Sequence, residues 1–266
     1  MRIGILLAVA AAMLAAPAAS AAPASDCKPQ ALRDLNRLAP EGYAIYRATD
    51  DKAFFTRWIT CDDVQLGLAT AVHETVHMIT EDKDAYPLIG GGSIKRVHAV
   101  SSFYPPREIA GRFDRNSTYV ETYLRPGAAS SADEFSYLLD ELNAYTHDLN
   151  SVIALQPLRN PVFQVDHRDG LASLMSFVMA YVDTAQRSKP KTWEGLQRPE
   201  VKKLIQTIWG QAETVLAKSC GIPGIGNEDR KLIAFMSDKK NNAAMNTILG
   251  RPTASAAACL SDGASS

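Results

Sequence analysis

Residues 63–80 read DVQLGLATAVHETVHMIT and have the apolar spacing of a helix that packs against a core. The side chains that set this spacing are Val64, Leu66, Leu68, Val72, Val76 and Ile79. Asp62 or Asp63 stands before the first of them, where an aspartate side chain can cap the first helical turn. The stretch therefore predicts one long helix that runs from this cap to about Thr80.

The same helix carries His73, Glu74 and His77 in the order H-E-x-x-H. Two histidines four residues apart lie on one face of a helix, one turn apart, so both imidazoles can bind one metal ion. Glu74 projects beside that face and can reach a water on the metal, as a general base must. The pattern predicts a Zn²⁺ site with His73 and His77 as ligands and Glu74 as catalytic base. The alternative is a pair of surface histidines on an amphipathic helix.

With this motif, the segment around residues 73–77 resembles the zincin superfamily of metallopeptidases. The metzincin branch would have glycine and histidine where this chain has Thr80 and Lys83, so that branch is excluded. A gluzincin-like arrangement remains, in which a glutamate from a later helix is the third ligand. Glu141 is the candidate, because its helix is flanked by apolar residues and a buried carboxylate needs a partner or a metal. The competing candidates are His147, Asp140 and Glu121.

One position departs from the resemblance. Many gluzincins have an aspartate four residues after the glutamate ligand, and Tyr145 stands there in this chain. Some other acidic group would therefore have to orient His73 or His77. Peptide hydrolysis also needs a donor to the developing oxyanion, and we expect Tyr145, one turn after Glu141, in that role. The alternative for Tyr145 is a packing residue. Further candidate donors are His147, Tyr119, Tyr123 and His167.

The first residues predict a cleavable export signal. Residues 1–2 carry one positive charge, an apolar run follows to about Ala16, and residues 19–21 (ASA) provide a cleavage site. The apolar run is too short to span a bilayer. We therefore expect residues 1–21 to be a signal peptide and the mature protein to be secreted or periplasmic.

The chain has four cysteines, Cys27, Cys61, Cys220 and Cys259. An even number of cysteines in an exported chain predicts two disulfide bonds. Their distribution in two pairs along the sequence favours Cys27–Cys61 and Cys220–Cys259 among the three possible connectivities. A cysteine metal site would need close C-x-x-C pairs, which the sequence lacks.

The fold class we expect is α+β and predominantly helical, zincin-like, with the motif helix, a small sheet and a helical C-terminal lobe. Besides the motif helix, helices are expected over 31–38 (ended by residues 40–42), 133–155 (capped by Ser131 or Asp133), 171–186, 201–218 and 229–249. Short strands are expected over 43–46, 53–59, 85–89, 94–100 and 118–123, with a turn at Gly90-Gly91-Gly92. The motif helix and the 133–155 helix should cross so that their ligands converge, with hairpins from Tyr86 to Leu124 lining a substrate cleft.

The expected domain organisation follows from these elements. After the signal peptide, residues 22–126 form an N-terminal lobe with the motif helix and the sheet. Residues 127–252 form a helical lobe that carries the third ligand. Residues 253–266 are rich in alanine and serine and form a flexible tail, which Cys259 tethers.

The charge balance limits the kinds of partner. The sequence has 28 basic and 29 acidic side chains, a formal net charge of −1. Such a balance gives no basic surface for nucleic acid and no polybasic run for an anionic membrane. We expect a peptide or protein substrate, no nucleic acid and no membrane span, while the oligomeric state is left open.

The expected function is zinc-dependent hydrolysis of peptide bonds. Two other functions fit the same residues. A non-catalytic secreted binding or inhibitory protein could keep the motif helix with a structural metal ion, held in a closed site of four ligands. A zinc hydrolase of a non-peptide amide or ester would use the same three motif residues. The sequence does not separate the last possibility from a peptidase.

Overall fold

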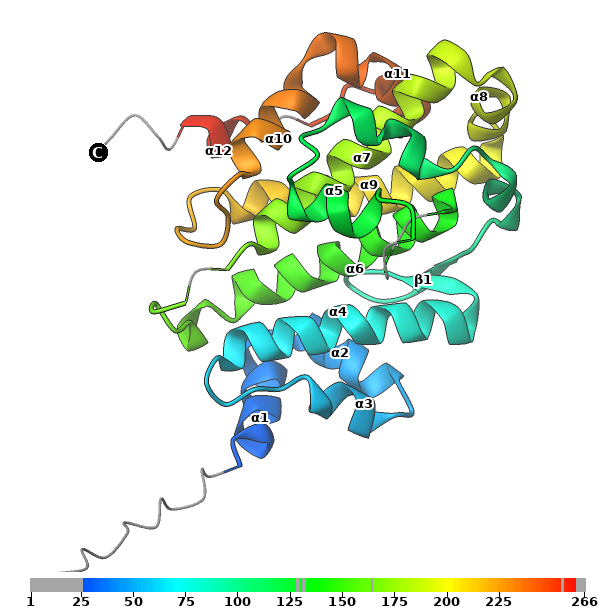
Figure 1. Cartoon of the computed structure of the whole chain (residues 1–266). Coiled ribbons are helices and arrows are strands. Elements are labelled where there is room, and N and C mark those ends of the chain that lie inside the picture. The colour runs from blue at the N-terminus through cyan, green and yellow to red at the C-terminus, as the bar shows by residue number, and fades with distance from the viewer. Residues whose placement is uncertain (1–25, 128–129, 131–132, 164, 255, 262–266) are drawn as a thin grey trace, which may run out of the picture.

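The computed structural model describes residues 26–127, 130, 133–163, 165–254 and 256–261. The predicted signal peptide lies outside the described residues. The described part of the chain is mostly helical, as Figure 1 shows. Its α-helices are α1 (Lys28–Leu38), α2 (Pro40–Ala48), α3 (Lys52–Arg57), α4 (Val64–Lys83), α5 (Thr118–Tyr123), α6 (Phe135–Ala154), α7 (His167–Ser188), α8 (Pro190–Leu196), α9 (Pro199–Ser219), α10 (Asp229–Ser237), α11 (Lys239–Leu249) and α12 (Ala257–Ser261). Three short 3-10 helices span His98–Ser102, Pro106–Arg112 and Gln156–Leu158.

The sheet is a single antiparallel hairpin of β1 (Ala85–Pro87) and β2 (Ser93–Lys95), with Tyr86 opposite Ile94. The predicted glycine turn joins the two strands. Gly90, Gly91 and Gly92 all have positive φ, which side chains rarely tolerate. An α+β fold that is predominantly helical is thus confirmed, with a much smaller sheet than the sequence suggested.

The motif helix α4 forms as predicted. The Asp63 side chain caps it by accepting a hydrogen bond from the Leu66 backbone N–H at 3.0 Å. The helix runs three residues beyond the predicted end and stops at Asp84, whose left-handed φ of 48° breaks the helical geometry. The cap and the apolar spacing were therefore sufficient to predict this element.

Helix α6 packs beside α4 and runs in the opposite direction (Figure 1). At one end of the pair, Gln65 Nε2 donates to the Val152 carbonyl at 2.9 Å. Toward the other end, His77 meets Asp140. This antiparallel packing fixes which residues of the two helices face each other, and so it positions the site described below.

Several predicted strands are helices in the structure. Residues 43–46 lie in α2, 53–59 overlap α3, and 118–123 form α5. Start signals for two of these helices are present, because Pro40 occupies the first turn of α2 and the Asp51 side chain caps α3. The expected hairpins along residues 86–124 are therefore wrong beyond β2. Pro40 begins a helix rather than only ending α1.

Two further helix boundaries were also predicted incorrectly. The N-cap of α6 is Glu134, without a side-chain cap, and Asp133 pairs with Arg107 instead; Ser131 lies outside the described residues. The single helix expected over 229–249 is broken at Asp238, whose side chain caps α11 by accepting from Lys240 N–H at 2.7 Å.

Both predicted disulfide bonds are present. Cys27–Cys61 ties the start of α1 to the segment before α4, and Cys220–Cys259 ties the end of α9 to α12. Their presence is compatible with an extracellular location. No helix in the described part of the chain is long and apolar enough to cross a membrane.

The buried apolar side chains form two clusters. The smaller one joins α1, α2 and α3 to the inner face of α4, with Leu35, Phe55 and Leu68 at its centre. The larger one lies among α5 to α11, where Phe177 and Trp209 are buried. Helices α4 and α6 each contribute to both clusters, so the pair is central to the fold. The lobe boundary expected near residue 127 stays a prediction.

Candidate metal centre

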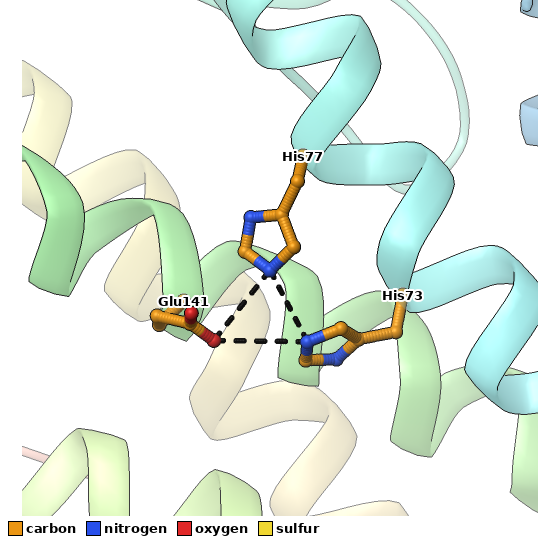
Figure 2. Close-up of side chains that lie close together, drawn as sticks. All are labelled: His73, His77 and Glu141. Atoms are coloured by element: carbon orange, nitrogen blue, oxygen red, sulfur yellow. Dashed lines mark hydrogen bonds and ion pairs between the residues drawn. The ribbon is translucent and has the colours of Figure 1, made fainter. Parts of the chain in front are cut away.

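His73 and His77 of α4 converge with Glu141 of α6 (Figure 2). The two Nε2 atoms lie 3.2 Å apart. Glu141 Oε2 lies 3.6 Å from His73 Nε2 and 3.5 Å from His77 Nε2. The ligand atoms of all three residues fall within 4.8 Å of one another, so this group could bind a metal ion.

Glu141 is 3% exposed, and its Oε2 atom has no hydrogen-bond partner among the described residues. A buried carboxylate oxygen without a partner is costly. Burial raises the pKa of Glu141, but the two histidines beside it outweigh burial and hold that pKa below its ordinary value. The carboxylate is therefore charged. An anionic oxygen facing two imidazole nitrogens in a buried position fits a cation.

His77 is held from its other side by an aspartate. Its Nδ1 lies 2.6 Å from Asp140 Oδ2, a distance typical of a charge-assisted hydrogen bond. When Nδ1 donates to Asp140, Nε2 of the neutral ring keeps the lone pair that a metal needs. Asp140, a competing candidate for the third ligand, thus lies on the far nitrogen of His77. It lies where an acidic group that orients His77 would lie.

His73 has a corresponding but looser neighbour. Its Nδ1 lies 3.9 Å from Asp148 Oδ2. Asp148 Oδ1 in turn lies 2.8 Å from Nδ1 of His167, the first residue of α7. His167 was a candidate oxyanion donor, and the structure places it behind Asp148. Sequence reasoning missed Asp148, although its position seven residues after Glu141 puts it two turns along the same helix face.

Tyr145 lies next to His73. Its ring centroid is 4.6 Å from that of His73, and its hydroxyl lies 2.9 Å from the hydroxyl of Tyr123. Burial raises the pKa of Tyr145, so the hydroxyl keeps its proton. Gly170 of α7 gives the ring its space, because a Cβ at that position would lie 2.2 Å from Tyr145 Cε1. Tyr119 also lies near this ring, with its ring centroid 6.1 Å from that of Tyr145.

The remaining candidates lie away from the three converging groups. His147 is buried, and its Nε2 lies 3.0 Å from the Pro87 carbonyl of β1. Burial lowers the pKa of His147 to about 4, so the ring is neutral near pH 7. Glu121 is exposed on α5 and does not belong to the group.

Glu74 is partly exposed, and within the described residues no hydrogen bond or ion pair engages its carboxylate. It lies on a side of α4 whose residues are at least partly exposed, which we call the open side, although α6 still covers part of this side at His73. The residues of this open side are Leu66, Thr70, His73, Glu74, His77 and Met78. Glu74 thus offers an unpaired and partly exposed carboxylate on the helix that carries the two histidines.

Comparisons of the chain with protein-family models, with curated proteins and with solved structures found no match.

Proposed function

We propose that this protein is an exported, zinc-dependent metallopeptidase with a zincin-like active site. The observation that carries the proposal is the convergence of His73, His77 and Glu141 on one point beside the open side of α4. Three protein ligands leave a coordination position for water or substrate, as in catalytic zinc sites. A closed structural site would need a fourth protein ligand, and the group has three members among the described residues.

The donor set is one that zinc accepts, with two imidazole nitrogens and a carboxylate oxygen. A bound zinc ion would supply Lewis acidity, which lowers the pKa of water and polarises a carbonyl group. Glu74 would take the proton from the attacking water and deliver it to the leaving amine. Its partly exposed and unpaired carboxylate supports this role, because no competing partner among the described residues holds it.

Tyr145 would donate its hydroxyl proton in a hydrogen bond to the developing oxyanion. Support comes from its ring packing against His73 and from Tyr123, whose hydroxyl holds that of Tyr145 at 2.9 Å. Asp140 would keep His77 in the tautomer that presents Nε2 to the ion. Export to an oxidising compartment, through the predicted signal peptide, agrees with the two disulfide bonds.

The test is the Glu74→Gln variant of the mature protein, with Glu81→Gln as matched control. Glu81 lies on the same helix, is exposed and already pairs with Arg96. We expect wild type and both variants to bind one zinc ion per chain, measured by elemental analysis. Hydrolysis of a mixed peptide library should fall by about 100-fold or more in Glu74→Gln only. Full activity of Glu74→Gln, or a wild-type protein that binds no zinc, would overturn the proposal.

A further inference from the structure

Three large apolar side chains are exposed among the described residues: Leu66 lies in the first turn of α4, and Val162 and Phe163 lie in the connection between α6 and α7. Val162 is 84% exposed, Phe163 42% and Leu66 38%. Single exposed apolar residues are ordinary on a protein surface, but a group of them in one place is typical of a binding surface. We call these three residues the apolar cluster.

A hydrogen bond ties the connection that carries Val162 and Phe163 to the segment just before α4. Asn160 Nδ2 donates to the carbonyl of Asp62, the residue two positions before α4 begins, at 3.3 Å. The side chain and the carbonyl of Asn160 accept from the backbone N–H groups of Val162 at 3.1 Å and Phe163 at 3.2 Å. The connection between α6 and α7 is thereby anchored beside the start of α4 (Figure 1). Val162 and Phe163 are thus held in an ordered turn while they face solvent.

The apolar cluster is in line with the metal centre. Leu66, Thr70, His73 and His77 are spaced by four, three and four residues, so they share one face of α4. All four lie on the open side of the helix. Seven residues separate Leu66 from His73, which corresponds to about 10 Å along a helix axis. An extended peptide covers that length with about three residues.

Building on the proposed function, we propose that Leu66, Val162 and Phe163 form a substrate subsite. It binds a large apolar side chain of an extended peptide, about three residues from the bond that is cleaved. The occupant is the substrate because the apolar cluster and the histidines lie on the same open helix face. Because burying a large apolar side chain there is favourable, the protein should prefer substrates with an apolar residue at this position over substrates with a polar one.

Two pairs of peptides test this subsite. Each pair is built on a sequence that the protein cleaves at one bond, with leucine or glutamine placed three residues before that bond in one pair and three residues after it in the other. We expect wild type to prefer leucine by about tenfold in kcat/KM in one of the pairs. The double variant Val162→Ser/Phe163→Ser should lose this preference. Because both side chains are exposed, its thermal unfolding should match that of wild type.

The control variant is Ile94→Ser on β2, which removes a partly exposed apolar side chain outside the apolar cluster. It should keep the leucine preference. An equal preference in wild type and in the double variant, or none in wild type, would overturn the subsite. A double variant that keeps the preference but turns a dimer into a monomer, measured by sedimentation, would assign the apolar cluster to self-association instead.

A binding measurement separates this proposal from the proposed function. The zinc-loaded Glu74→Gln protein and its Val162→Ser/Phe163→Ser derivative are titrated with the same peptides carrying a fluorophore. Tighter binding of the leucine peptide to the first protein, lost in the second, would support the subsite even if wild type cleaves no peptide. Equal binding of leucine and glutamine peptides would overturn the subsite even if wild type is an active peptidase.

Discussion

His77 and His73 differ in how firmly the protein holds them. The Asp140 carboxylate lies 2.6 Å from Nδ1 of His77, whereas the Asp148 carboxylate lies 3.9 Å from Nδ1 of His73. A carboxylate that accepts a hydrogen bond from the ring nitrogen not bound to the metal fixes the tautomer of a ligand histidine. It also makes the other nitrogen a stronger electron-pair donor to the metal. His77 should therefore depend on its aspartate more than His73 does.

The Asp140→Asn variant tests this dependence. We expect its zinc affinity to fall by about 10- to 100-fold, because the amide carries no charge to stabilise the proton on His77 Nδ1. Competition with a chromogenic chelator measures the affinity without relying on activity. Asp84→Asn is the matched control, since Asp84 is exposed, follows the same helix and pairs with His98. Equal zinc affinity in the two variants would show that Asp140 does not support His77.

At the scale of elements, α6 supplies most of what surrounds the two histidines. Asp140, Glu141, Tyr145 and Asp148 lie on the side of this helix that faces α4. They span two turns of α6, and because the helices run antiparallel, Asp140 lies beside His77 and Asp148 lies nearer His73. One helix pair is therefore sufficient to bring together the proposed ligands, the carboxylates beside them and the Tyr145 hydroxyl.

The sequence predicted the parts of this arrangement that are local. The H-E-x-x-H spacing and the apolar flanks of Glu141 are readable along the chain, because a helix converts spacing into direction. The ion pair between Asp148 and His167 cannot be predicted from the sequence, since tertiary packing decides where α7 begins relative to α6. Short apolar runs such as 43–46 fit a strand or a helix equally, and there the start signal at Pro40 was more informative than the periodicity.

Two separate glycine-to-alanine substitutions test how α7 supports the site. Gly170→Ala should destabilise the protein by about 1–3 kcal/mol, because the new methyl group overlaps Tyr145 at 2.2 Å and must displace its ring. Gly210→Ala on α9 is the control, since no atom lies within 4 Å of a Cβ at that position. At that position the higher helix propensity of alanine should raise the free energy of unfolding of the protein by up to about 1 kcal/mol. Urea unfolding measures both, and a stabilised Gly170→Ala protein would contradict the close packing of Tyr145.

At the scale of the whole molecule, the two buried clusters of the hydrophobic core, the smaller and the larger, meet at α4 and α6. Disulfide bonds tie down the ends: Cys27 of the Cys27–Cys61 bond packs against the smaller cluster, and Cys220–Cys259 belongs to the larger one. Neither bond links α4 directly to α6. Along the face that carries the site, the two helices bring a buried carboxylate against two imidazoles. A metal ion between them would therefore act as a cross-link at the centre of the fold.

Removal of zinc should accordingly lower the thermal stability of the whole chain. An ion that binds only the folded state stabilises it by about 2.7 kcal/mol when its free concentration is 100 times its Kd. For a chain of this size we expect Tm to fall by about 5–10 °C on adding a chelator. Scanning calorimetry without reductant, which leaves both disulfide bonds closed, measures the shift. The His73→Ala/His77→Ala variant should have the same Tm with zinc and with chelator. A wild-type Tm that does not respond to the chelator would show that no ion joins α4 to α6, and an equal response in the variant would place the ion elsewhere.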